Sequence, residues 1–159
     1  MLLVLPRRLA LFSIVSAAAL CTTTMAQADL GGTMAGVRAD RARMNARLAS
    51  IDKGNFARHD LTRGNGAMVR EFTNPAGQVF AVTWSGPGKP DLRALLGQHF
   101  SALKPSATRR DMRGLRRPLQ VAQADLQIQT SGHMGWFNGV AYIPSLATGF
   151  STANLPVQP

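Results

Sequence analysis

Residues 68–84 read MVREFTNPAGQVFAVTW. Two short runs containing β-branched and aromatic residues flank Asn74-Pro75-Ala76-Gly77, a tetrapeptide that is typical of a tight turn. In the second run the large side chains Phe80, Val82 and Trp84 stand at every second position, which places them on one face of a strand. The stretch therefore predicts an antiparallel hairpin with one apolar face.

Further strands are expected on both sides of this hairpin. A weaker run over 56–61 precedes it and ends at the turn residues Gly64-Asn65-Gly66. A second β region follows, with alternation over 126–129 and a return over 133–143. Within that return, Asn138-Gly139 indicates either another tight turn or a bulge. Together these runs predict an antiparallel meander of about five strands.

An amphipathic helix is expected between the two β regions. Pro90 suits the first helical position, and Asp91 in the first turn faces the positive end of the helix dipole. Four leucines and Phe100 then recur at spacings of three and four until Pro105 ends the pattern. A helix over 90–104 packed on one face of the sheet makes the fold α+β. The sparse apolar residues of 37–51 predict a second, solvent-exposed helix.

The first 28 residues have the organisation of a secretory signal peptide. The pair Arg7-Arg8 precedes an apolar run over 9–20, and Ala26-Gln27-Ala28 fits a small-x-small cleavage site. A membrane anchor is the alternative, but the run spans only about 18 Å as a helix, against ~30 Å for a bilayer core. We expect cleavage after Ala28, export to the periplasm or beyond the cell, and no transmembrane segment in the mature chain.

The mature chain is expected to have a polar, partly helical N-terminal segment over 29–54, one α+β domain over 55–144 and a flexible tail over 145–159. Cleavage removes two arginines and no acidic residue, so the net charge of +10 becomes +8. It also removes Cys21, the only cysteine of the chain. The mature protein therefore has no disulfide, thiol nucleophile or thiolate metal site, and packing must stabilise it.

Five arginines between the predicted helix and the second β region form the clearest charge feature. They are Arg109, Arg110, Arg113, Arg116 and Arg117. Because arginine pairs bidentately with phosphate and carboxylate, this connector suits anionic lipid or polysaccharide headgroups. It also suits nucleic acid, which we do not expect as a physiological partner of an exported protein. The alternative is a solvated loop without a ligand.

Catalytic and metal-binding signals are weak. The three histidines lie far apart in the sequence, and no cofactor or metal site is predicted. His133 is a weak candidate for a general base with Asp91 or Asp125 as its orienting partner, and a hydrogen-bonded turn histidine is the favoured alternative. For Glu71, the single glutamate of the chain, we expect a cross-strand ion pair.

The aromatic residues allow two interpretations. Trp84, Trp136 and Tyr142 could form a surface on which a sugar stacks, but on alternating strands such residues more often belong to the core.

Two segments carry a resemblance to a known family. They are VREFTNPAGQVFAVTWSGPGKPDLRALLGQHF over 69–100 and SGHMGWFNGVAYIP over 131–144. Together they resemble a family of small exported proteins of Gram-negative bacteria that is known only as a domain of unknown function. Where the family pattern often has glycine and arginine, this chain has Ser131 and Val140. The resemblance implies export and a shared fold, and it implies no activity, cofactor or catalytic residue.

These observations lead to one function hypothesis and two alternatives. The first is a non-catalytic periplasmic or secreted module that binds an anionic envelope component through the five arginines. The second is a small periplasmic hydrolase centred on His133. The third is an accessory subunit of an envelope assembly, which would expose a large apolar patch on its strands.

Overall fold

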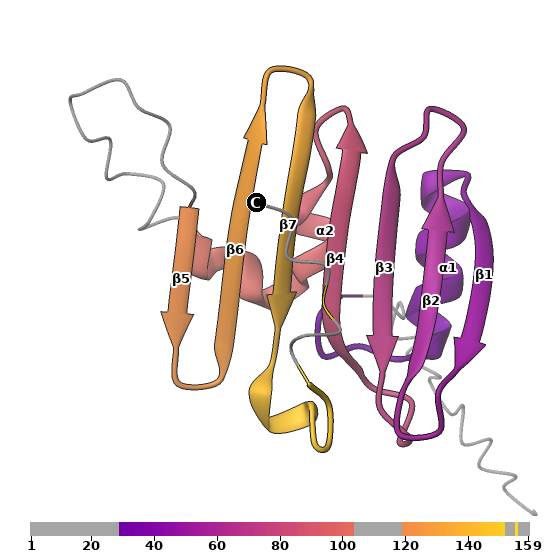
Figure 1. Cartoon of the computed structure of the whole chain (residues 1–159), viewed down its shortest axis with the longest axis vertical. Coiled ribbons are helices and arrows are strands. Elements are labelled where there is room, and N and C mark those ends of the chain that lie inside the picture. Colours follow the sequence, from indigo (N-terminus) through magenta and orange to yellow (C-terminus); the bar gives the residue numbers. More distant parts are fainter. Residues whose placement is uncertain (1–28, 104–118, 152–154, 156–159) are drawn as a thin grey trace, which may run out of the picture.

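Seven antiparallel strands form one sheet in the computed structural model, which describes residues 29–103, 119–151 and 155. The order across the sheet is β1-β2-β3-β4-β7-β6-β5, and both α-helices lie behind the same face (Figure 1). The strands are β1 (Arg47–Asp52), β2 (Ala57–Thr62), β3 (Met68–Thr73), β4 (Val79–Pro87), β5 (Leu119–Gln123), β6 (Leu126–His133) and β7 (Trp136–Tyr142). The helices are α1 (Met34–Met44) and α2 (Leu92–Leu96), with 3-10 segments η1 (Gly97–Ala102) and η2 (Pro144–Leu146). The predicted α+β class is confirmed, but about five strands was an underestimate.

The predicted hairpin is β3 and β4, joined by the predicted turn. Asn74 accepts a hydrogen bond from the Gly77 N–H at 2.8 Å, and Gly77 has a φ of +77°, which favours glycine. The pairing shifts at Phe72/Thr73, so Phe80 is an extra residue in β4. Phe80 therefore packs with Phe72, at 6.2 Å between ring centroids, and does not join Trp84 in the larger apolar cluster. The prediction that Phe80, Val82 and Trp84 share one face is wrong for Phe80.

The predicted exposed helix over 37–51 is instead a helix followed by an edge strand. Asn45 adopts left-handed φ and ψ angles of 48° and 47°, which end α1 and let the chain reverse into β1. Val37 and Asp40 are buried under the helix, so α1 covers the sheet. The sequence pattern hid this because a helix with few apolar residues buries a narrow stripe, and a mostly exposed edge strand needs few apolar side chains.

The predicted helix over 90–104 is shorter than expected among the described residues. Asp91 caps α2 by accepting the Ala94 N–H at 3.1 Å, and the α-helix ends at Leu96. Gly97 has a positive φ of 51°, and a Cβ there would overlap the side chain of Asp29. The chain continues from Gly97 as a 3-10 helix, and Leu95, Leu96 and Leu103 are buried in the core.

The second β region contains three strands. β5 was not predicted from the sequence. Asn138-Gly139 is neither a turn nor a bulge, because β7 keeps an unbroken register with β4 and β6 through both residues. The β6–β7 hairpin turns instead at Met134-Gly135.

Part of the expected C-terminal tail lies on the sheet. Phe150 contacts Phe56, Phe72 and Phe80 with ring centroids 5.0, 5.7 and 4.8 Å apart, and Leu155 is buried in the same cluster. This second apolar cluster covers one end of the face opposite the helices. No helix in the described ranges is long and apolar enough to cross a membrane.

Candidate functional site: a polar groove on the open face

The two faces of the sheet are lined by alternate residues of the same strands. On the covered face, both helices pack on side chains such as Val82 and Ile128 to form the main core. The opposite face carries no helix in the part of the chain that the structure describes, and we call it the open face (Figure 1).

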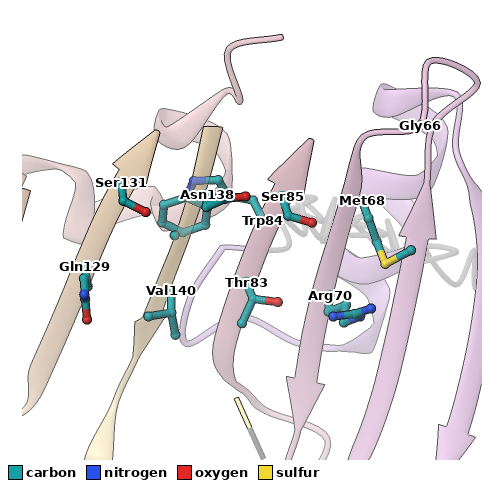
Figure 2. Close-up of a pocket in the computed structure, with 11 residues that line it drawn as sticks. Gly66, Met68, Arg70, Thr83, Trp84, Ser85, Gln129, Ser131, Asn138 and Val140 are labelled. Carbon is teal, nitrogen blue, oxygen red and sulfur yellow. The ribbon is translucent and has the colours of Figure 1, made fainter. Parts of the chain in front are cut away.

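A groove of about 150 Å³ lies on the open face, across β3, β4, β7 and β6 (Figure 2). It is built mainly from two rows of cross-strand neighbours. One row is Arg70, Thr83, Val140 and Gln129, and the other is Met68, Ser85, Asn138 and Ser131. Gly66, Trp84 and Gly139 complete the lining. We call this site the polar groove, because hydroxyl, amide and guanidinium groups from four strands converge on it.

Most polar groups of the groove are available to a ligand. No side-chain hydrogen bond is found for Thr83, Ser85, Gln129 or Ser131 in the described residues. Asn138 uses its Oδ1 to accept the Trp136 Nε1–H at 3.0 Å and keeps its amide donor. Side chains without internal hydrogen bonds can donate hydrogen bonds to a ligand and accept them from it without breaking existing ones.

Arg70 gives the polar groove a positive charge. Its Nε lies 3.4 Å from Asp60 Oδ1, and Arg58 contacts the other oxygen of Asp60 at 3.0 Å. One carboxylate thus faces two guanidinium groups, which leaves a net positive charge on these three side chains. The terminal nitrogens of Arg70 have no hydrogen-bond partner in the described part of the chain, so they can bind an anion bidentately.

Of the three aromatic side chains singled out from the sequence, two belong to the open face. Trp136 is 39% exposed at the end of β7, and the Tyr142 hydroxyl donates to Gln127 at 2.9 Å. Trp84 is buried on the covered side, where a Cβ on Gly139 would overlap its indole ring. Gly139 is thus required for the close packing of Trp84 beneath β7.

A buried pair of carboxyl groups lies under α1. Glu71 on β3 is fully buried, and Asp40 on α1 is 3% exposed and bound by Arg43 at 2.7 Å. Burial, followed by the adjacent Asp40 carboxyl group, raises the pKa of Glu71 to about 9. Burial also raises the pKa of Asp40, against the opposing effect of Arg43. Glu71 is therefore protonated at neutral pH and can donate its proton to Asp40.

The expected cross-strand ion pair of Glu71 is wrong. Its neighbours across the sheet are His59 and Val82, and the ion pairs of this region are on the open face. No local pattern indicates that Asp40 lies above Glu71, since that contact depends on the docking of α1. Because both carboxyl groups are inaccessible to a substrate, the pair affects stability and not binding.

His59 is also a structural residue. Its Nδ1 lies 2.9 Å from the Ser50 hydroxyl and its Nε2 lies 3.0 Å from the Thr73 hydroxyl. Burial lowers its pKa, against the effect of Asp60, so the neutral ring is favoured in the folded protein.

The structure does not bring His133 and Asp125 together. They stand at opposite ends of β6: Asp125 accepts the Ser145 N–H at 2.8 Å and the Ser145 hydroxyl at 2.6 Å, which lowers its pKa. His133 is exposed, and its Nδ1 lies 3.3 Å from the Met134 carbonyl oxygen. Asp91 caps α2 and contacts Arg43 at 3.3 Å. None of the three forms a described hydrogen bond with another.

Other predicted sites lie outside the described residues. These are the cleavage residues Ala26 and Ala28 and the connector arginines Arg109, Arg110, Arg113, Arg116 and Arg117. Where the structure is described, no cluster of three His, Cys, Asp or Glu side chains could hold a metal ion. Three large apolar side chains are exposed in the described residues: Ile51, Met134 and Trp136. Ile51 is on β1, and the other two belong to the distant β6–β7 hairpin, so the three form no continuous patch.

Sequence reasoning missed the polar groove. The sequence does contain a signal for this site, because polar residues stand at every second position of two strands. They are Gln129 and Ser131 in β6 and Thr83 and Ser85 in β4. That period of two marks a solvent-facing side. The order of the strands, which makes β4 and β6 the two neighbours of β7, could not be inferred from the pattern.

Comparisons with known proteins give one match. No curated protein and no solved structure matches the chain significantly. Residues 26–155 match the family described as "Protein of unknown function (DUF2844)". This range contains both segments that carried the resemblance, the whole described sheet and the polar groove. The chain therefore belongs to the DUF2844 family, a domain of unknown function.

Proposed function

We propose that this protein is an exported, non-catalytic module that binds an acidic carbohydrate of the cell envelope on the open face of its sheet. The observation that carries the proposal is the polar groove, in which four side chains without internal hydrogen bonds lie across β4 and β6 and Arg70 lies at the β3 end. Export rests on the signal-peptide pattern of the first 28 residues.

The chemistry of the polar groove suits a sugar acid. Hydroxyl and amide side chains both donate and accept, as the hydroxyl groups of a sugar require. Such side chains line the groove from two strands, Thr83 and Ser85 from β4 and Gln129 and Ser131 from β6. Arg70 adds a planar pair of donors for a carboxylate. Trp136 and Tyr142 lie on the same face and offer aromatic surface for a sugar ring.

The predicted basic connector would add a second anionic contact. Its five arginines contribute to a mature net charge of +8, which favours binding to a polyanion and makes that binding sensitive to salt. We propose that the connector attracts the polyanion and that the polar groove selects the sugar.

Co-sedimentation with vesicles that contain lipopolysaccharide tests the proposal across a salt series. Arg70→Gln should weaken binding by about tenfold or more, because a hydrogen bond to a charged group contributes ~1.5–3 kcal/mol. Arg41→Gln is the matched control, since Arg41 is exposed on α1, away from the polar groove. The substitution removes the same charge as Arg70→Gln. Equal losses in both variants would mean that only net charge matters, and would refute the proposed site.

A second variant separates the connector from the polar groove. Replacing all five connector arginines by serine should reduce the affinity for lipopolysaccharide vesicles and the salt dependence of that affinity. The preference for acidic over neutral glycans should remain. If the connector variant abolishes binding and Arg70→Gln has no effect, the open face is not the site. Vesicles of anionic phospholipid without glycan should bind more weakly than lipopolysaccharide vesicles, and equal binding would contradict a carbohydrate ligand.

A further inference from the structure

A second cavity, of about 200 Å³, lies at one end of the sheet, away from the centre of the open face. It is bounded by the end of α1, the β2–β3 turn, the end of β4 and the segment that leads into α2. Its inner wall is apolar and contains Met44, Val69, Trp84, Leu95 and Phe137. Three of these side chains, Val69, Trp84 and Leu95, are buried and rigidly placed in the core.

The size of this cavity suits a small apolar group. An apolar protein cavity of about 150 Å³ stays dry and binds benzene, so about 200 Å³ holds a benzene-sized group with a few more atoms. A ligand that replaces water against the apolar wall buries apolar surface and makes dispersion contacts with it. The inner wall therefore favours the tail of an amphipathic molecule.

The mouth of the cavity is positively charged. Arg63 and Lys89 are exposed at the rim, and neither forms an ion pair in the described residues. Arg43 and Asp91 also line the cavity, and they pair with each other at 3.3 Å, while Arg43 binds Asp40 as well. The two unpaired cations give the mouth an excess positive charge, which complements an anionic head group.

We propose that this cavity is a second binding site, which takes a small carboxylate with an apolar tail, such as an aryl-alkanoate or a medium-chain fatty acid. The tail occupies the wall formed by Val69, Trp84 and Leu95, and the carboxylate lies between Arg63 and Lys89. The cavity shares Met68, Trp84 and Ser85 with the lining of the polar groove, but its cations Arg63 and Lys89 do not line the groove. The inference does not depend on the proposed function.

The indole fluorescence of Trp84 can report ligand binding in this cavity. The chain has two tryptophans, so Trp136→Phe leaves Trp84 as the only source of indole fluorescence. In this background, 4-phenylbutyrate and octanoate are titrated, with 4-phenylbutanol and octanol as uncharged probes. We expect a saturable fluorescence change for the carboxylates, with an affinity at least tenfold above that of the matching alcohols.

Charge variants test the mouth. Arg63→Gln with Lys89→Gln should remove the tenfold preference and leave the affinity for the alcohols unchanged. Arg38→Gln with Lys53→Gln is the matched control, because both side chains are exposed and lie outside the cavity. This double substitution removes the same amount of positive charge. The control pair should keep the preference.

Three outcomes would overturn the inference. The first is the absence of a saturable change with any of the four probes at millimolar concentration. The second is equal affinity for carboxylates and alcohols in the parent protein. The third is loss of carboxylate binding in Arg70→Gln: since Trp84 also lines the polar groove, that result would place the probe on the open face.

Discussion

The covered and open faces of the sheet differ although they alternate along the same strands. On the covered face of β4, Val82 and Trp84 are buried in a core shared with both helices. On the open face of the same strand, Thr83 and Ser85 line a groove and have no side-chain partner among the residues described. The covered face is filled with internal contacts that stabilise the fold. On the open face, a second apolar cluster covers one end, and the polar groove keeps its hydrogen-bonding capacity for a ligand. Substitutions should therefore affect stability on one face and binding on the other.

The largest effect is expected at Trp84. Trp84→Ala removes a buried aromatic side chain from the covered face, and losses of about 3–5 kcal/mol in the free energy of unfolding are usual for such changes. Chemical denaturation measures this loss. Trp136→Ala on the open face is the matched change, and it should cost much less because Trp136 is 39% exposed. Similar losses at the two positions would break the distinction between the faces.

The next effect concerns pH and Glu71. Its pKa is about 9 in the folded protein, against 4.5 as the ordinary value. At a pH between these two pKa values, Glu71 is protonated in the folded protein and ionised in the unfolded chain. In this range the free energy of unfolding therefore falls by about 1.4 kcal/mol for each pH unit of increase. Glu71→Gln keeps a hydrogen-bond donor for Asp40 but cannot ionise.

We therefore expect Glu71→Gln to be more stable than the parent protein at pH 8 and close to it at pH 4.5. Thermal unfolding across this range provides the measurement. His59 affects the parent protein and the variant equally. Because its pKa is lowered in the folded protein, its contribution reduces stability as the pH falls below about 6.5. A constant difference in melting temperature between the two proteins at all pH values would show that Glu71 is ionised in the fold.

A smaller effect is expected at Gly139. A Cβ at this position would overlap the Trp84 ring and lie close to the Gln129 carbonyl oxygen. Gly139→Ala should cost about 1–3 kcal/mol through overpacking. Gly64→Ala is the matched comparison, because a Cβ there meets no atom within 4 Å and, as at Gly139, φ is not positive. If both glycines give the same loss, the close packing of Trp84 under β7 is not the cause.

The smallest effect on stability is expected in the polar groove. Combined Ser85→Ala and Ser131→Ala should change the free energy of unfolding by no more than about 0.5 kcal/mol per site, since these half-buried side chains have no described hydrogen bonds to lose. The same protein should bind acidic glycan more weakly. A large loss of stability would mean that these hydroxyl groups serve the fold.

The sequence predicted the features that depend on neighbouring residues. The β3–β4 hairpin and its Asn74–Gly77 turn follow from alternation and turn chemistry, and both are confirmed. The break of the helix at Gly97 was missed because a leucine pattern continues through it, whereas the backbone there follows from the contact with Asp29. Local patterns do not report such long-range contacts.

The same limit explains what was missed at the candidate site. Glu71 is an ordinary strand residue in the sequence, and only the docking of α1 places Asp40 against it. The polar groove joins Arg70 to Gln129, which lie far apart in the chain and share a row only through β4 and β7. The five connector arginines were conspicuous because charge runs are local features, and their role stays a prediction.

Amide chemical shifts during a glycan titration test the central claim most directly. The probe is a trisaccharide of galacturonic acid, with neutral maltotriose as its control. We predict saturable shifts at Arg70, Thr83, Gln129 and Asn138, no shifts on α1, and a much weaker response to maltotriose. Absence of shifts in the polar groove, with or without shifts elsewhere in the protein, would contradict the assignment of the open face as the binding site.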